Sequence, residues 1–166
     1  YGVPQIRQRV IIAGTKKGLL HFNFPAPTHC NPIKMNGERL KPWLTISEAI
    51  KTIPEPSEKS NLLNHIYSKY KVTDRDFTGH RLTDPNKPSP TILARGNAKG
   101  GVCVIQHYNN HRRMTIRECA TIQTFPLNYR FYGSMTSCYR QIGNAVPVLF
   151  AKALGKELRR LEKEIR

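Results

Sequence analysis

The chain has 166 residues, enough for one ordinary domain or for one large and one small lobe around a buried core. Its 27 Lys and Arg residues against 11 Asp and Glu give a formal net charge of +16, which favours nucleic acid as a partner over an acidic protein or a membrane surface. No apolar run approaches the ~20 residues of a membrane-spanning helix, and the four widely spaced cysteines, with no C-x-x-C pair, argue against a zinc site or a disulfide framework and for free thiols in a reducing cytoplasm.

The N-terminal segment predicts a basic loop followed by a strand. The loop contains Gly and Pro and carries Gln5, Arg7 and Arg9. Residues 10–13 are apolar, mostly β-branched, and stop at a glycine. A run of this kind is typical of a strand buried on both faces of a parallel sheet.

The middle of the chain predicts little regular structure. Thr45 and Glu48 have the spacing of a capping box, which predicts a short helix that ends before Pro54. The apolar residues of 62–67 predict another helical turn or two, and residues 73–90 are basic and rich in turn formers. An irregular middle between two well-patterned ends indicates an inserted lobe.

The C-terminal end predicts helices. Thr115 and Glu118 form a second capping-box pattern and begin a short helix. A last helix is expected from about Pro147 to about Lys163, because its apolar residues recur at three and four. The Gly-Asn pair at 143–144 lies between these helices, where we expect a tight turn.

Four stretches occur in a fixed order along the chain: GVPQIRQRVIIAG, SPTILARG, RRMTIRECATIQTFP and YRQIGNAVP. Together they resemble the C-terminal portion of the DNA (cytosine-5)-methyltransferases. The first resembles the eighth conserved motif of that family, and the third and fourth resemble its ninth and tenth. The second resembles a Thr-containing dipeptide of its target-recognition domain.

The resemblance implies an α/β fold, namely the C-terminal portion of a Rossmann-like methyltransferase fold that uses S-adenosylmethionine, with a small irregular target-recognition lobe. It implies three parts: residues 1–27 as terminal strands of the catalytic domain, residues 28–113 as the target-recognition domain, and residues 114–166 as the return to the catalytic domain. Enzymes of this family flip a cytosine out of duplex DNA, attack its C6 with a cysteine thiolate and methylate C5 from S-adenosylmethionine, as in restriction-modification systems. A prokaryotic cytoplasm, with association to the nucleoid, is the expected location.

The family's nucleophile lies in a Pro-Cys motif, its methyl-donor loop in F-x-G-x-G and its glutamate in E-N-V, and none of these occurs here. We therefore expect the chain alone to be inactive. It would be one polypeptide of a split enzyme or an excised C-terminal part, and its partner would be the N-terminal half. Cys119, on the apolar side of its predicted helix, is expected in the core.

The resemblance assigns roles to single residues. Gln5, Arg7 and Arg9 would form the cytosine pocket, with Arg9 reaching O2 of the base or the adjacent phosphate and Arg7 ordering the pocket. The amino-acid end of S-adenosylmethionine would lie against a second group, mainly through backbone amides at a helix start: Gly143, Asn144, Ala145 and Val146.

Thr91 would touch the DNA backbone near the target cytosine. Basic residues on either side of the expected lobe would contact phosphates: Arg95, Lys99, Arg112 and Arg113. Arg117 would brace the recognition lobe against the core, and Glu118 would cap its helix. No metal ligand set is expected.

Two alternatives remain open from the sequence. The first is a DNA-binding remnant of a methyltransferase that regulates or tethers without catalysis. The second is a relative that modifies RNA. Retention of both the expected cytosine loop and the Gly-Asn segment argues against a decayed remnant.

Overall fold

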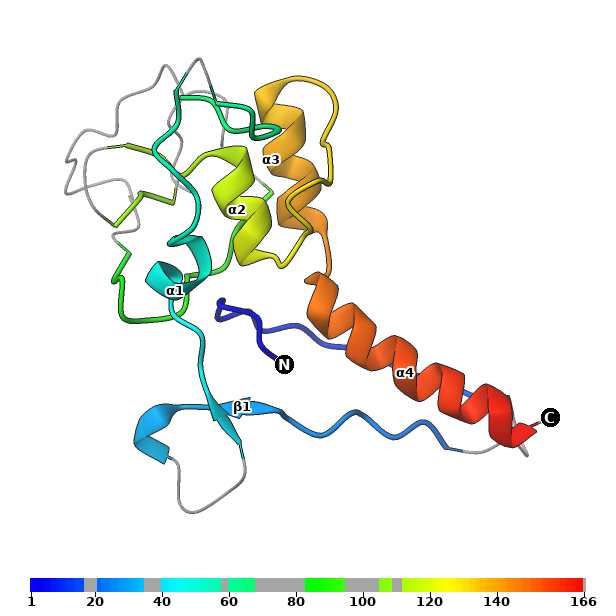
Figure 1. The fold of residues 1–166 in the computed structure, drawn as a ribbon. Helices are drawn as coiled ribbons and strands as arrows, with labels where there is room; N and C mark the ends of the chain where they lie inside the picture. Colours follow the sequence, from blue (N-terminus) through cyan, green and yellow to red (C-terminus); the bar gives the residue numbers. More distant parts are fainter. Residues whose placement is uncertain are drawn as a thin grey trace.

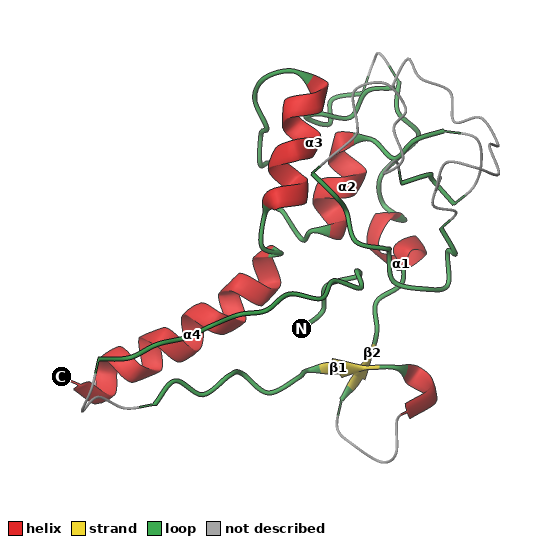
Figure 2. Ribbon diagram, turned by 180° about the vertical axis from the view of Figure 1, so that it is seen from behind, coloured by secondary structure: helices red, strands yellow, loops and turns green. Residues whose placement is uncertain are grey.

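A computed structural model describes seven segments of the chain: residues 1–16, 21–34, 40–57, 60–67, 83–94, 105–108 and 112–165. Their elements, in chain order, are β1 (His29–Cys30), the 3-10 turn η1 (Pro32–Lys34), β2 (Lys41–Pro42), α1 (Ile46–Ile50), α2 (Ile116–Ile122), α3 (Met135–Asn144) and α4 (Val148–Ile165). β1 and β2 pair in parallel. The described chain is thus a mixed α/β structure with a small sheet (Figures 1 and 2).

Both predicted capping boxes are present. The hydroxyl of Thr45 accepts from the Glu48 amide at 3.2 Å, and the Glu48 carboxylate accepts from the Thr45 amide at 2.8 Å. Thr115 and Glu118 repeat this exchange at the start of α2, at 3.1 and 2.7 Å. Each box satisfies two amides that a helix start leaves unpaired, so these predictions are confirmed.

Helices α1 and α3 both pack against α2, and all three contribute to one core (Figure 1). Apolar side chains from all three helices and from the segments between them are buried there, including Ile46, Ile50, Ile92, Ile105, Met114, Ile122, Cys138 and Ile142. The core therefore takes residues from both sides of the expected boundary at 113/114. The three-part division itself stays a prediction.

Arg117 connects two surface segments from inside this core. Its side chain is fully buried and donates to the backbone carbonyl oxygens of Leu63, Pro126 and Tyr129. Burial lowers the pKa of the guanidinium below its ordinary value. The five N–H groups of an arginine suit a site formed by several carbonyl oxygens, and the observed contacts agree with the bracing role expected for Arg117.

The predicted strand at residues 10–13 is wrong for this structure. Val10 and Ile12 are each 90% exposed, and the segment has no strand pairing within the described ranges. A strand forms only when a neighbouring strand accepts its backbone hydrogen bonds, and none of the described segments pairs with this one. The helical turns expected at 62–67 are also wrong, since this segment forms a turn and no helix.

The last helix is confirmed, but the junction before it differs from the prediction. Gly143 and Asn144 are the last residues of α3 and not a turn. The chain leaves the helix at Ala145, whose ψ is 148°, and α4 begins at Val148 after a proline. α4 then extends away from the other helices, with the N-terminal segment running alongside it in both views (Figures 1 and 2).

Candidate functional site

The loop after Gly2 pairs with the segment 89–92. The amide of Ser89 donates to the carbonyl oxygen of Pro4 at 2.9 Å, and the amide of Ile6 donates to the carbonyl oxygen of Ser89 at 2.8 Å. Gln5 lies opposite Ser89 in this short parallel bridge. The hydroxyl of Thr91 continues the pairing by donating to the carbonyl oxygen of Ile6 at 2.7 Å. The two segments, which carry the first and second family-like stretches, are therefore held side by side.

Arg7 joins this pair to the end of α3. Its guanidinium donates to the carbonyl oxygen of Ile92 at 3.0 Å and to that of Gly143 at 2.8 Å. Gly143 lies directly against the same segment: a Cβ there would be 2.4 Å from the Ala94 amide nitrogen and 2.5 Å from the Leu93 carbonyl carbon. Only glycine permits so close an approach of two backbones.

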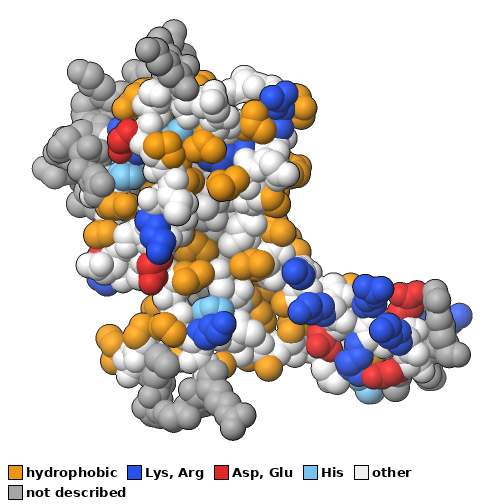
Figure 3. Space-filling model, viewed as in Figure 1, with side chains coloured by type: hydrophobic (Ala, Val, Ile, Leu, Met, Phe, Trp, Pro, Cys, Tyr) orange, Lys and Arg blue, Asp and Glu red, His pale blue; other side chains and the backbone are white. Residues whose placement is uncertain are grey.

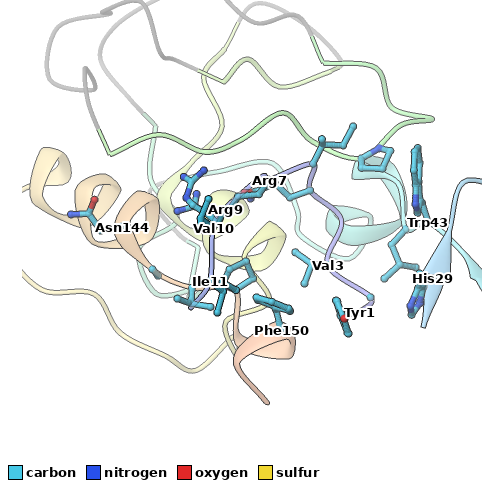
Figure 4. Close-up of a pocket in the computed structure, with 18 residues that line it drawn as sticks. Tyr1, Val3, Arg7, Arg9, Val10, Ile11, His29, Trp43, Asn144 and Phe150 are labelled. Carbon is cyan, nitrogen blue, oxygen red and sulfur yellow. The ribbon is translucent and has the colours of Figure 1, made fainter. Parts of the chain in front are cut away.

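A pocket of about 530 Å³ opens beside these contacts (Figure 4). The basic loop contributes Gln5, Arg7 and Arg9, and the α3–α4 junction contributes Asn144, Ala145 and Val146. Residues more than 130 positions apart in the chain thus face one space. The structure thus brings together residues of the expected cytosine pocket and of the expected cofactor site, which are two of the three groups that the sequence predicted.

Gln5 is the most informative side chain in this pocket. It is only 9% exposed, and neither its amide nitrogen nor its amide oxygen has a hydrogen-bond partner among the described residues. Leaving a buried polar group unpaired costs about 1–3 kcal/mol. A buried amide with both a donor and an acceptor unused is therefore fitted to a group from outside the described chain.

Arg7 and Arg9 differ in their surroundings although both line the pocket. Burial lowers the pKa of the Arg7 guanidinium, and the nearby charge of Arg9 lowers it further. Arg9 is exposed, and its one hydrogen bond within the described segments goes to the adjacent Gln8 carbonyl. Arg7 is consequently committed to the protein, whereas most of the Arg9 guanidinium is available to a ligand.

Three backbone amides at the α3–α4 junction have hydrogen-bond partners, namely those of Ala145, Val148 and Leu149. The Ala145 amide donates to two carbonyl oxygens of the last turn of α3, at 3.1 and 3.2 Å. The Val148 amide donates to the Gln123 carbonyl oxygen at 3.1 Å, and the Leu149 amide to the Thr124 hydroxyl at 3.0 Å. The loop after α2 thus caps part of the start of α4, and the cofactor contact expected at this junction stays a prediction.

The residues expected at the junction consequently differ in what they can offer a ligand. The exposed side chain of Asn144 and the 54% exposed Val146 line the pocket together with Ala145. Gly143 packs against the backbone of Leu93 and Ala94 instead. The side chain of Asn144 is thus available to a ligand, and the cofactor contact expected of this group stays a prediction.

Two of the residues expected to contact DNA phosphates, Arg112 and Arg113, have partners within the described chain. Arg112 donates to the carboxylates of Glu55 and Glu118 at 2.8–3.1 Å. Arg113 is 4% exposed, and its guanidinium carbon lies 4.3 Å from the ring centre of Tyr139. Both arginines have internal partners, so their phosphate contacts stay predictions. Arg95 and Lys99 lie outside the described residues.

A buried polar cluster surrounds Glu118. Burial alone would raise the pKa of this carboxyl, but the hydrogen bonds and charge of Arg112 and the Thr115 amide outweigh it, so the pKa lies below its ordinary value. The carboxylates of Glu118 and Glu55 raise the pKa of Arg112, although burial alone would lower it. Burial lowers the pKa of His107, whose Nε2 is 3.7 Å from Glu118. Glu118 and Arg112 are thus ionised at neutral pH and His107 is neutral, which suits a structural role.

Cys119 and Cys138 do not resemble nucleophiles. Burial raises the pKa of the Cys119 thiol to about 12, and burial also raises the pKa of Cys138. A thiolate, not a thiol, is the attacking form, so neither residue is activated. Within the described ranges there is also no cluster of His, Cys, Asp and Glu that could hold a metal ion, and no helix long and apolar enough to cross a membrane.

Sequence reasoning missed the aromatic side of the pocket. Tyr1, His29, Trp43 and Phe150 line it (Figure 4), and the rings of Tyr1 and Phe150 lie 5.0 Å apart between centroids. No local pattern marks these residues, because each comes from a different segment. They give the pocket flat apolar walls, to which planar rings can stack.

A basic chain with a pocket of arginine, amide and aromatic side chains has the features of a protein that binds nucleic acid. The model of the C-5 cytosine-specific DNA methylases matches residues 1–160, and the chain belongs to this family. It is 34% identical to the Type II methyltransferase M.NgoFVII of Neisseria gonorrhoeae, over 95% of this chain and 46% of that protein.

Other relatives give the same result. The Type II methyltransferase M.BspRI of Lysinibacillus sphaericus is 35% identical over 95% of this chain and 40% of its own length. DNA (cytosine-5)-methyltransferase 1B of Oryza sativa is 36% identical over 64% of this chain and 6% of its own length. The chain therefore spans less than half of each of these relatives.

Proposed function

We propose that this chain is the DNA-recognising C-terminal part of a DNA cytosine-5 methyltransferase of a restriction-modification system, acting on cytosine in a specific duplex sequence. The observation that carries the proposal is the buried amide of Gln5, which has no hydrogen-bond partner among the described residues and lies in a pocket that Arg9 and Asn144 also line. Family membership supports the same activity.

The pocket is suited to a flipped pyrimidine. The edge of cytosine offers both hydrogen-bond donors and acceptors, as does the Gln5 amide. The guanidinium of Arg9 can reach O2 of the base or the adjacent phosphate, because it is exposed and charged. Arg7 acts as a positioning residue, since both of its hydrogen bonds go to the backbone that surrounds the pocket. Removal of the base from the stack exposes this edge to protein contacts.

S-adenosylmethionine is the cofactor of this proposal, shared with the N-terminal part. When bound, it supplies the methyl group. The described residues that fit it are Asn144, Ala145 and Val146, of which Asn144 has a side-chain amide able to donate to a carboxylate. Gly143 would act indirectly, by keeping the end of α3 against the segment 92–94.

The proposal requires an N-terminal part with the nucleophilic cysteine, either as a separate subunit or as upstream chain. None of the four cysteines follows a proline, and Cys119 and Cys138 have raised pKa values. Val10, Ile12 and Val146 are 90%, 90% and 54% exposed. An apolar surface of this kind near the pocket is suited to contact with that part. Without it, the chain is inactive.

The test mixes the chain with an N-terminal polypeptide that contains the Pro-Cys motif and follows tritium transfer from S-adenosylmethionine to duplex DNA. Transfer that needs both polypeptides supports the proposal. A mixture that binds duplex DNA and never methylates it would establish a DNA-binding module instead. Methylation of tRNA alone would exclude DNA as the substrate.

A further inference from the structure

The long helix α4 (Val148–Ile165) carries a row of positive charge that the pocket does not use. Lys152, Lys156, Arg159 and Lys163 follow one another at intervals of four, three and four residues. These intervals return to the same side of a helix at each turn. All four side chains are exposed, and Figure 3 shows Lys and Arg along this helix with acidic side chains between them. We call these four residues the α4 stripe.

Two of the three acidic residues of α4 form ion pairs with an arginine outside the stripe. Glu157 and Glu164 both bind Arg160, at 3.0 Å and 2.5 Å. Among the residues that the structure describes, none forms an ion pair with a member of the α4 stripe. A row of four cations over three turns, with no ion pair among the described residues, makes this side of α4 positively charged.

The opposite side of α4 is turned toward the protein. Leu161 is 6% exposed, and Phe150 and Leu154 are half-buried. A helix that lies in a membrane surface instead inserts its apolar side into lipid. Leu149 and Leu158 of α4 are 39% and 58% exposed, but the α4 stripe lies on the side opposite Leu161. The charge of that side favours a phosphate polymer as the partner, and the lipid surface is tested below.

We propose that the α4 stripe binds the phosphate backbone of duplex DNA without regard to sequence, as a second contact next to the pocket. The stripe spans about 16 Å from Lys152 to Lys163, at 1.5 Å per helical residue. Phosphates along one DNA strand are about 3.4 Å apart in projection on the axis, so the stripe matches about five of them. Phe150 lines the pocket and Lys152 begins the stripe, so one duplex can reach both. This contact needs neither a flipped base nor a methyl donor.

The experiment measures binding of the 166-residue chain to a labelled 30-base-pair duplex of arbitrary sequence by fluorescence anisotropy, from 50 to 200 mM KCl, without S-adenosylmethionine. The variant K152Q/K156Q/R159Q/K163Q removes the α4 stripe and keeps good helix formers. Because each phosphate contact contributes about 0.9 to the slope of log K against log salt, the slope should become shallower by about 3, and affinity at 100 mM KCl should fall at least tenfold.

The matched control is K41Q/K51Q/R130Q/R140Q, which removes the same charge from exposed residues elsewhere. Its slope should change by less than about 1. Circular dichroism establishes that both variants keep their helices. Equal slope changes in the two variants, or an unchanged slope in the stripe variant, would overturn the proposal.

A third measurement covers the membrane alternative. Vesicles of phosphatidylcholine and phosphatidylserine at 3:1 are sedimented with the chain and with the stripe variant. Loss of vesicle binding with an unchanged DNA slope would assign the stripe to a lipid surface. Because methylation is not measured, the result is independent of the split-enzyme test.

Discussion

The Arg7 guanidinium donates a 2.8 Å hydrogen bond to the carbonyl oxygen of Gly143, which lies 136 residues further along the chain. The same guanidinium binds Ile92, and Gly143 lies against the backbone of Leu93 and Ala94. Three segments distant in sequence therefore share one small contact region beside the pocket. Its members can be tested separately.

Gly143→Ala should destabilise the chain by about 1–3 kcal/mol, because the added Cβ would lie 2.4 Å from backbone that has to shift. Gly155→Ala is the matched control: it lies in α4, with nothing within 4 Å of the position that the added methyl would take, and should stabilise by about 0.5–1 kcal/mol. Urea unfolding at equilibrium measures both. Equal effects would contradict the close approach.

Arg7→Ala should also lower the unfolding free energy, by about 1–3 kcal/mol, because it leaves two partly buried carbonyl oxygens without a donor. Arg7→Lys should recover only part of the loss, since one ammonium cannot reproduce the planar fork. Arg9→Ala should change stability by less than about 0.5 kcal/mol, because Arg9 is exposed. Urea unfolding of the three variants is the measurement, and a loss in Arg9→Ala as large as in Arg7→Ala would refute this division.

In the complete enzyme, Arg9→Ala should reduce turnover strongly although it changes stability little. Arg9→Ala should reduce kcat by at least 100-fold while duplex affinity falls less than tenfold, since basic residues elsewhere supply most of the binding. Single-turnover methylation and anisotropy under the same salt conditions measure the two quantities. Normal turnover in Arg9→Ala would exclude its contact with the flipped base.

The starts of α1 and α2 were predictable because their chemistry is local, whereas α3 (Met135–Asn144) was not predicted. Thr45 with Glu48 and Thr115 with Glu118 form their capping boxes within four residues, so the pattern alone specifies the bonds. The conformation of residues 10–13 was not predictable in this way, because a strand needs a second strand to pair with, and the sequence of the segment itself does not contain that partner. The same limit applies to Gly143: its type indicates a special backbone position, but only the fold shows that the reason is contact with Leu93 and Ala94.

The candidate site was predictable in part for the same reason. The family-like stretches identified Gln5, Arg7, Arg9 and the junction residues, and the structure places most of them around one pocket. The aromatic walls at Trp43 and Phe150 come from segments without a motif. The phosphate-contact assignment of Arg112 overlooked Glu55, a partner 57 residues away.

Acid should destabilise the chain through Glu118. Its pKa in the folded state lies below the ordinary 4.5, so its stabilising contribution is complete above about pH 4.5 and is lost as the pH falls through the lower, folded value. Glu118→Gln should cost about 3 kcal/mol at pH 7, because it breaks a buried ion pair, and should flatten the pH dependence below 4.5. Glu55→Gln, at a side chain 59% exposed, is the control and should cost less than about 1 kcal/mol. Thermal melts between pH 3 and 7 distinguish the two variants.

Thiol labelling measures whether Cys119 and Cys138 are as unreactive as their burial indicates. In the native chain at pH 8, Cys119 and Cys138 should resist iodoacetamide, because both are buried and the pKa of Cys119 is raised to about 12. Half-buried Cys30 serves as the internal control and should react faster. Peptide mass spectrometry gives the rate at each site. Fast modification of Cys119 would return it to consideration as the attacking residue.

The paired segments 4–7 and 89–92 set a condition for exchanging the middle of the chain between relatives. Pro4 and Ile6 share backbone hydrogen bonds with Ser89, and Thr91 and Arg7 extend the same seam. In a chimaera, the segment taken from the other parent should therefore begin after Ala94. Residues 4–7 and 89–94 then come from the same parent and keep their hydrogen bonds. A junction inside residues 89–94 would combine segments from two parents in this one hydrogen-bonded pair, and we expect the pocket beside it to be distorted.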